Sequence, residues 1–109
     1  MRVIIESPYA GDIKTNTRYL QAAMRDSVLR GESPYASHGL LTQEGVLDDN
    51  DPVERDIGIK AGQRWLVVAD IVVVYTDLGI SSGMAMGIEA ANNIKKPVVL
   101  RTLPNWFKS

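Results

Sequence analysis

The stretch "ADIVVVYTDLGISSGM", residues 69–84, decides the fold of this chain. Its apolar run at 70–76 has no polar alternation, which is typical of a strand buried on both faces of a parallel sheet. Two serines and a glycine follow before residues with helical character begin. A buried strand that turns directly into a helix predicts a doubly wound α/β fold.

The rest of the chain alternates between strand and helix patterns around that stretch. The order β-α-β-loop-α-β-α-β predicts a small flavodoxin- or Rossmann-like three-layer α/β sandwich with a mostly parallel sheet, in one domain over residues 1–109. The remaining short elements are expected as strands at 2–6, near 33–37 and at 97–102, and as a helix at 82–94.

Two longer helices are predicted from apolar spacing. The first runs from about Asp12 to Arg30 and stops at Gly31; the second is capped by Asp51, with Pro52 at its first position. Residues 38–51 between them are expected to form a functional loop. The side chains expected to point inward are Leu20, Ala23, Met24 and Val28 on the first helix, and Ile57, Ala61, Trp65 and Val68 on the second.

Composition excludes several classes of function. A net charge of −1 with scattered lysines and arginines gives no electrostatic case for a nucleic-acid partner. The chain has no cysteine, which excludes disulfides, thiolate nucleophiles and cysteine-type zinc sites. No apolar run approaches the roughly 20 residues of a membrane span, and the chain starts with a strand pattern rather than a signal peptide. We therefore expect a cytoplasmic protein without membrane contact.

The candidate site lies where the predicted strands end, because the carboxyl ends of parallel strands meet at one edge of the sheet. There the turn Ser81-Ser82-Gly83 leads into a helix whose first amides and dipole favour an anion such as a phosphate. The alternative is a plain helix cap, for which serine is also a preferred residue.

The segment "ESPYAGD", residues 6–12, forms a second turn at the same edge. Tyr9 offers a flat face to a base or a sugar, and Asp12 or Asn16 offers hydrogen bonds to ligand hydroxyls. The alternative is a proline turn in which Asp12 only caps the helix, and the two interpretations are compatible.

The single histidine and the acidic run allow two further interpretations. His38 falls in the loop near the site, where it is either structural or a ligand-binding or acid–base group. The run "DDND" at 48–51 lacks the glycine and the distant glutamate of a calcium loop, so solvated helix-capping is favoured over a metal site. We expect no metal and no cofactor.

The segments "SPYAG", "ADIVVVYTDLGISSGM" and "KKPVVL" together resemble the nucleoside 2-deoxyribosyltransferase superfamily. That group includes 2′-deoxynucleoside 5′-phosphate N-hydrolases and small domains of unknown function common in phages and bacteria. The resemblance spans almost the whole chain, and its most specific part is residues 69–99. It implies a flavodoxin-like sandwich with a pocket for a nucleoside or nucleotide.

The resemblance also implies where chemistry would occur. The superfamily cleaves N-glycosidic bonds with a glutamate nucleophile, assisted by an aspartate and a tyrosine. Carried onto this chain, the glutamate position is Gly87, the aspartate position is Ala61 or Gly62, and the tyrosine position is Ile4. All three positions lack the functional group, whereas the binding turns are retained and His38 matches loosely a histidine of the N-hydrolases.

The sequence therefore favours a nucleotide-binding protein that is not catalytic. It would bind or sequester a phosphorylated nucleoside, or an ADP-ribose-like or cyclic signal, in a bacterial or phage-infected cytoplasm, and the roles considered include action against a host defence. The alternative is an N-glycosidase or deoxyribosyltransferase that uses Asp77, Glu89 or a carboxylate from a neighbouring subunit. The expected ligand-binding residues are Ser7, Pro8, Tyr9, Asp12, Asn16, His38, Asp77, Ser81, Ser82, Gly83, Met84 and Gly87.

Two expectations concern Gly87 and the C-terminal tail. At Gly87 we expect open space in the pocket that admits a larger or more anionic ligand, so Gly87→Glu should weaken such a ligand. The tail "LPNWFKS" carries Trp106 and Phe107. Either these aromatics join an interface in a homo-oligomer, as the resemblance implies, or the tail folds back onto its own core.

Overall fold

The computed structural model describes residues 1–108, and its elements follow the predicted order. The chain ends in a 3-10 turn, η1, at Trp106–Lys108. The strands are β1 (Arg2–Glu6), β2 (Ser33–Tyr35), β3 (Ile71–Tyr75) and β4 (Val98–Arg101), and the helices are α1 (Ile13–Leu29), α2 (Ser37–Leu40), α3 (Pro52–Val68) and α4 (Ser82–Asn93).

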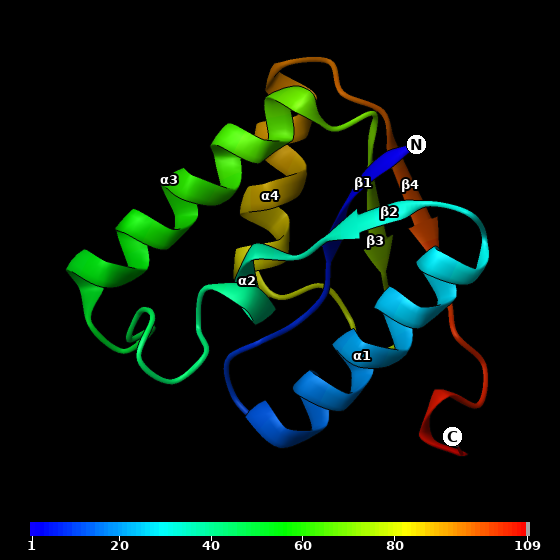
Figure 1. The fold of residues 1–109 in the computed structure, drawn as a ribbon, viewed down its shortest axis with the longest axis horizontal. Helices are drawn as coiled ribbons and strands as arrows, with labels where there is room; N and C mark the ends of the chain where they lie inside the picture. Colours follow the sequence, from blue (N-terminus) through cyan, green and yellow to red (C-terminus); the bar gives the residue numbers. More distant parts are fainter. Residues whose placement is uncertain (109) are drawn as a thin grey trace.

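The four strands form one sheet in the order β2-β1-β3-β4, and every pairing is parallel. Helix α1 packs on one face, and α3 and α4 pack on the other (Figure 1). The predicted three-layer α/β sandwich is thereby confirmed. The residues of β3 from Val72 to Tyr75 are fully buried, as the apolar run predicts.

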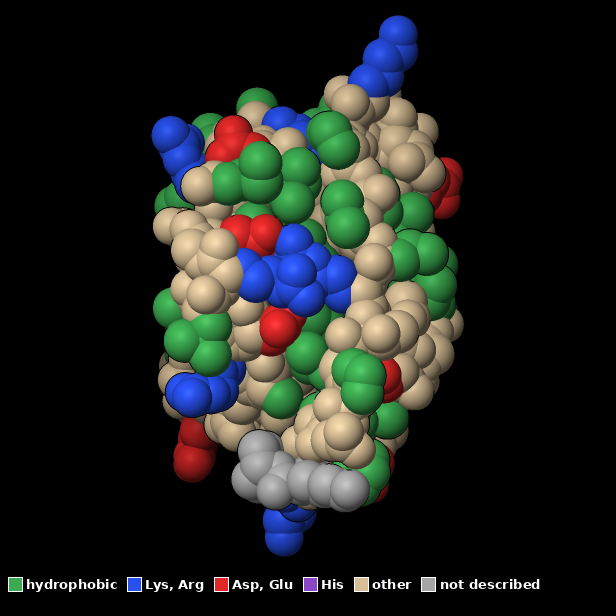
Figure 2. All heavy atoms as spheres, turned by 90° about the vertical axis from the view of Figure 1, so that its right-hand side faces the viewer, with side chains coloured by type: hydrophobic (Ala, Val, Ile, Leu, Met, Phe, Trp, Pro, Cys, Tyr) green, Lys and Arg blue, Asp and Glu red, His purple; other side chains and the backbone are tan. Residues whose placement is uncertain are grey.

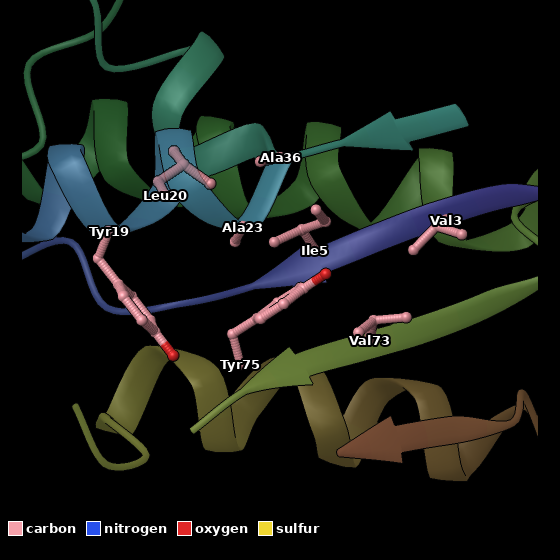
Figure 3. Packing of buried hydrophobic residues seen from close by; sticks show 8 residues of the cluster. All are labelled: Val3, Ile5, Tyr19, Leu20, Ala23, Ala36, Val73 and Tyr75. Atoms are coloured by element: carbon pink, nitrogen blue, oxygen red, sulfur yellow. The ribbon is translucent and has the colours of Figure 1, made fainter. Parts of the chain in front are cut away.

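Alternation along β1 divides its side chains between the two faces of the sheet. Val3 and Ile5 point toward α1, where they meet Tyr19 and Tyr75 in the main core (Figure 3). Ile4 packs on the opposite face, against the cluster beneath α3 and α4. Because the period is two, Glu6 faces the same side as Ile4.

Side-chain caps set the helix boundaries where the sequence predicts them. Asp12 accepts a hydrogen bond from the Thr15 amide at 3.1 Å and begins α1. Asp51 accepts one from the Val53 amide at 3.0 Å and begins α3. Gly31 follows α1 with a positive φ of 87°, a conformation that glycine adopts without strain.

The predicted inward stripe of α3 is wrong. Ile57 and Trp65 are 51% and 52% exposed, and Val68 is nearly as open, whereas the buried residue of the helix is Leu66. The inward face also carries residues that line a cavity, namely Ile59, Gly62 and Gln63. A helix that borders a cavity can turn a glycine and a glutamine inward, so apolar spacing alone misplaces its buried face.

Smaller differences from the expectations occur on α1 and around β2. Leu20 and Ala23 are buried as predicted, but Val28 is 55% exposed, because the buried face of α1 in its last turn is at Ser27 instead. The strand expected near 33–37 stops at Tyr35, and the start of the expected loop forms the short helix α2. Residues 41–51 form neither helix nor strand, as the loop prediction expects. The tail folds back in part: the Trp106 ring lies 5.1 Å from that of Tyr19, while Phe107 remains exposed.

The charged side chains form no broad surface of one sign in the view of Figure 2, where acidic and basic groups adjoin one another. This distribution agrees with the scattered charges along the sequence. Among the described residues, no helix has both the length and the apolar character needed to cross a bilayer.

A partly buried ion pair links the end of α1 to β4. The Arg101 guanidinium donates to both carboxylate oxygens of Glu32, at 2.8 and 2.6 Å, and both side chains are only 13% exposed. Arg101 also lies 3.3 Å from the hydroxyl of Tyr75, and Ser27 donates to Glu32 at 2.8 Å. The hydrogen bonds from Arg101 lower the pKa of Glu32 to about 2.

Replacement Glu32→Gln is expected to destabilise the fold by about 1–3 kcal/mol at pH 7, since it leaves the Arg101 charge without its partner. The pKa of Glu32 lies below its ordinary value, so its contribution to the unfolding free energy is complete above pH 4.5 and disappears toward pH 2. Denaturant unfolding of both proteins across that range measures this. Curves that stay parallel from pH 7 to pH 3 would contradict the assignment.

Candidate functional site

A cavity of about 190 Å³ lies at the carboxyl ends of β1 and β3 on the side of α3 and α4. In the sheet order β2-β1-β3-β4, the connection that follows β1 leads to β2 at one edge, and the connection that follows β3 leads to β4 at the other edge. The strand order therefore reverses between β1 and β3. Such a switch point is where open α/β sheets bind ligands. Its lining combines aliphatic and aromatic side chains with hydroxyl, carboxyl, imidazole and guanidinium groups, and ligand sites in proteins likewise join an apolar surface to polar groups.

Most of the predicted ligand-binding residues meet at this cavity, although they come from three separate turns. The members that line it are Ser7, Tyr9, His38, Ser81, Ser82, Gly83, Met84 and Gly87. The carboxyl-end turns after β1, β2 and β3 therefore gather at one edge, as the topology predicts.

Three other predicted residues lie in the loop between β1 and α1 or at the start of α1, and they do not line the cavity. Asp12 caps α1, and the Asn16 side-chain amide donates to the carbonyls of Tyr9 and Ala10 at 2.9 and 3.0 Å. Pro8 borders a separate groove beside α1. These contacts fix the position of Tyr9 from outside the cavity.

The two carboxylates named for a catalytic role also lie outside the cavity. The Asp77 carboxylate accepts hydrogen bonds from the Tyr19 hydroxyl at 2.6 Å and from the Leu103 amide at 2.7 Å. It thereby joins β3 to α1 and to the C-terminal segment. Glu89 is exposed on α4 and is absent from the cavity lining.

The N-terminus of α4 presents backbone donors to the cavity. The Ser81 hydroxyl caps the helix and accepts from the Met84 amide at 3.2 Å. The amides of Ser82 and Gly83 have no acceptor among the described residues, and the space beside Gly83 is open. The turn is both a helix cap and a set of free donors suited to an anion.

His38 forms a buried pair with Ser7. Its Nε2 lies 2.8 Å from the Ser7 hydroxyl, and burial lowers the pKa of His38 to about 4. The imidazole is therefore neutral at pH 7 and contributes hydrogen bonding rather than positive charge. Arg55, on α3, is the one lysine or arginine in the cavity lining as described.

Glu6 is the site residue that the sequence analysis missed. It ends β1, faces α4, and lines the cavity. Burial raises its pKa to about 7, and its carboxyl has no hydrogen-bond partner in the part of the chain that the structure describes. Strand alternation was the available signal, because "RVIIE" places Glu6 on the face opposite to the core residues Val3 and Ile5.

The open space expected at Gly87 does not exist. A Cβ atom at this position would lie 2.6 Å from Cδ of Glu6 and 2.9 Å from its Oε1. The carboxyl of Glu6 therefore fills the place where a side chain from α4 would begin. Glycine at position 87 leaves the Glu6 carboxyl room in this place.

The three positions to which the resemblance assigns catalytic groups converge on the same cavity. Ile4, Gly62 and Gly87 all line it. At Gly62 an added Cβ would lie 2.8 Å from the Ser37 hydroxyl oxygen, so this position is also closed to larger residues. No group of three histidine or acidic residues suited to a metal ion occurs within residues 1–108.

Comparison with known proteins identifies the family of the chain and a likeness to solved structures. The family model described as "Domain of unknown function (DUF7768)" matches residues 1–101, and the chain belongs to that family. No curated protein sequence matches.

The solved structure of a 2-deoxyribosyltransferase from Bacillus psychrosaccharolyticus superposes with a TM-score of 0.65 over 94% of this chain and 72% of that chain. At 18% identity this likeness shows a shared Rossmann-like α/β fold.

Substitution Gly87→Ala should destabilise the protein, although alanine in a helix normally stabilises it by about 1 kcal/mol relative to glycine. The added methyl group meets the carboxyl of Glu6, so the double variant Glu6→Ala, Gly87→Ala should recover stability. Gly83→Ala is the matched control, because its Cβ meets nothing closer than 4.0 Å. A stabilising Gly87→Ala in the presence of Glu6 would show that the two residues are not in contact.

The raised pKa of Glu6 predicts a pH-dependent cost to stability. In the folded protein the Glu6 carboxyl stays protonated up to about pH 7, whereas in the unfolded chain it loses its proton at about pH 4.5. The free energy of unfolding therefore falls as the pH rises between these values. Glu6→Gln should therefore gain stability relative to the wild type as the pH rises. The difference in unfolding free energy between the two proteins should shift in favour of the variant by about 2 kcal/mol from pH 4.5 to pH 8. Urea unfolding at both pH values checks this, with the exposed Glu89→Gln as the surface-glutamate control.

Proposed function

We propose that this member of the DUF7768 family binds a nucleotide in the cavity between β1, α3 and α4 and does not transform it. The phosphate lies at the N-terminus of α4 and the rest of the ligand extends along the helix. The observation that carries this proposal is the convergence of free amides, an apolar lining and one cation at the switch point of the sheet.

The phosphate end of the proposed site follows from the donors available. The Ser82 and Gly83 amides point from a helix whose dipole favours an anion, and the open flank of Gly83 allows close approach. Arg55 adds the positive charge. With Asp49 and Glu6 also in the lining, the site suits one phosphate better than a long polyphosphate chain.

The base end of the proposed site is apolar and aromatic. Tyr35 lies at the end of β2, with its ring centroid 5.1 Å from that of Trp65. Other lining residues on α3 and α4 are aliphatic, namely Ile59, Leu66, Met86 and Ala90. Such a surface stacks a flat base without fixing its identity.

A binding role rather than a catalytic one is supported by what fills the catalytic positions. Ile4 and Gly62 carry no group that could orient a nucleophile, and His38 is paired with Ser7. A protein of this kind would act by sequestering or sensing its nucleotide, which includes the ADP-ribose-like and cyclic signals considered from the sequence.

One observation favours a second candidate, cleavage of an N-glycosidic bond. This activity requires a carboxylate in the pocket, and Glu6 supplies one beside Gly87. In this candidate the carboxylate comes from the end of β1 instead of from α4, while Asp77 and Glu89 take no part. Retaining glycoside chemistry uses a carboxylate as its nucleophile.

A thermal-shift screen against nucleosides, nucleoside monophosphates, cyclic nucleotides and ADP-ribose, with chromatography of each mixture, tests the proposal. At least one phosphorylated ligand should raise the melting temperature and be recovered intact. Gly83→Asp should keep the fold, since an acidic residue suits a helix N-terminus, but weaken that ligand about tenfold or more. Gly83→Ala is the neutral control. A ligand recovered as free base and sugar would contradict the binding role and establish the second candidate.

A further inference from the structure

Among residues 1–108, the carboxyl of Glu6 has no hydrogen-bond partner, whereas the polar side chains near it have theirs. His38 is hydrogen-bonded to Ser7, and the Ser81 hydroxyl accepts from the Met84 amide. Within residues 1–108, every fully buried side-chain nitrogen or oxygen has a hydrogen-bond partner. Because the Glu6 carboxyl has none, its oxygens are not fully buried, and they are accessible from the cavity that Glu6 lines. A mostly buried acceptor that faces a ligand cavity needs its hydrogen bonds from the ligand.

The position of Glu6 along α4 indicates which part of a nucleotide it meets. Gly83 and Gly87 are four residues apart, so they share one face of the helix and are separated by about 6 Å along its axis. The carboxyl of Glu6 rests against Gly87, roughly one turn below the free amides. In a nucleotide the sugar comes next after the phosphate, and it would therefore lie beside Glu6.

The chemistry of a sugar supplies the donors that a carboxylate requires. A carboxylate has only acceptor sites, on two oxygens, and the vicinal 2′ and 3′ hydroxyls of a ribose offer two adjacent donors. An acidic side chain that reads the 2′-hydroxyl is a device used by other α/β nucleotide-binding sites. We propose that Glu6 accepts hydrogen bonds from the vicinal hydroxyls of a ribose, so that the cavity selects ribonucleotides over their 2′-deoxy counterparts; this inference rests on the proposed function.

Hydroxyl recognition fits Glu6 better than nucleophilic attack does. A nucleophilic carboxylate has to be ionised and oriented by a second group. No described side chain bonds to Glu6, and the neighbouring lining positions Ile4 and Gly62 carry no donor. Acceptance of hydrogen bonds from a bound ribose requires only that the carboxyl be placed and unpaired.

Binding of this kind is linked to protonation of Glu6. The other titratable groups that face the cavity are Tyr9 from the first turn, Tyr35 from β2, His38 from α2, Asp49 from the loop before α3, and Arg55 from α3, while α4 contributes none among the described residues. Donation from ribose hydroxyls favours the carboxylate over the carboxylic acid. Ribonucleotide affinity should therefore rise between pH 6 and pH 8.

Titration calorimetry with the 5′-monophosphates of adenosine, guanosine, cytidine and uridine, each against its 2′-deoxy counterpart, tests the inference on the wild-type chain. At pH 8, at least one ribonucleotide should bind about tenfold more tightly than its deoxy partner. This ratio should shrink at pH 6. The deoxy partner carries the same phosphate, so the ratio cancels phosphate titration.

Glu6→Gln should bring the ratio of affinities close to one and remove its pH dependence. Glu89→Gln, outside the cavity on α4, should keep the wild-type ratio, and thermal melts of both variants verify that they are folded. Equal affinity of the wild type for both sugars at pH 8 would overturn the inference and leave nucleotide binding standing.

Two further outcomes distinguish failure of the ribose inference from failure of the proposed function. If none of the eight nucleotides binds to the folded protein, and the thermal-shift screen with cyclic nucleotides and ADP-ribose also finds no ligand, the proposed site itself is wrong and the inference falls with it. If a 2′-deoxynucleotide yields free base with the wild type but not with Glu6→Gln, Glu6 is a reacting group, which overturns the inference in favour of the second candidate.

Discussion

The contact between the carboxyl of Glu6 and the backbone of α4 at Gly87 sets the chemistry of the whole site. The backbone of Glu6 is fixed, because β1 lies between β2 and β3 and Glu6 pairs with Val74. Helix α4 cannot retreat without exposing Met84 and Ala91, which are buried against the sheet. A side chain at position 87 would therefore displace the Glu6 carboxyl from the place that it occupies.

The architecture assigns separate tasks to the two faces of the sheet. On the α1 face, Tyr19, Asp77 and Asn16 join strands, loops and the C-terminal segment through hydrogen bonds. On the α3 and α4 face, the layers part at the carboxyl ends of β1 and β3 and leave a cavity. Its polar groups lie in order along α4, with free amides at the helix end and the Glu6 carboxyl about one turn deeper. This order complements the phosphate and the sugar of the proposed nucleotide ligand.

The sequence is sufficient for features that depend on local chemistry. The unbroken apolar run of β3, the caps at Asp12 and Asp51, and the turn at Ser81 each reflect a few adjacent residues, and the structure has them where they are expected. The meeting of the three turns also follows, because parallel strands end at one edge.

Features that depend on packing between distant segments could not be predicted in the same way. The buried face of α3 was misplaced because Gly62 and Gln63 border a cavity and do not follow apolar spacing. Asp77 was expected in the ligand site, but the hydroxyl of Tyr19, 58 residues away, donates a hydrogen bond to it on the other face of the sheet. Open space was expected at Gly87, but the carboxyl of Glu6, from the first strand, occupies that space. Each error came from a neighbour that is remote in sequence.

The function proposed for the pocket depends on a mostly buried carboxyl at Glu6 that has no partner among residues 1–108. The most direct measurement is a titration of the Glu6 side-chain carboxyl by carbon-13 NMR in the ligand-free protein, with Glu6→Gln used to assign the resonance. Burial of the carboxyl predicts a midpoint about pH 7. A midpoint near the ordinary glutamate value of 4.5 would place the carboxyl in water and show that the pocket does not bury it.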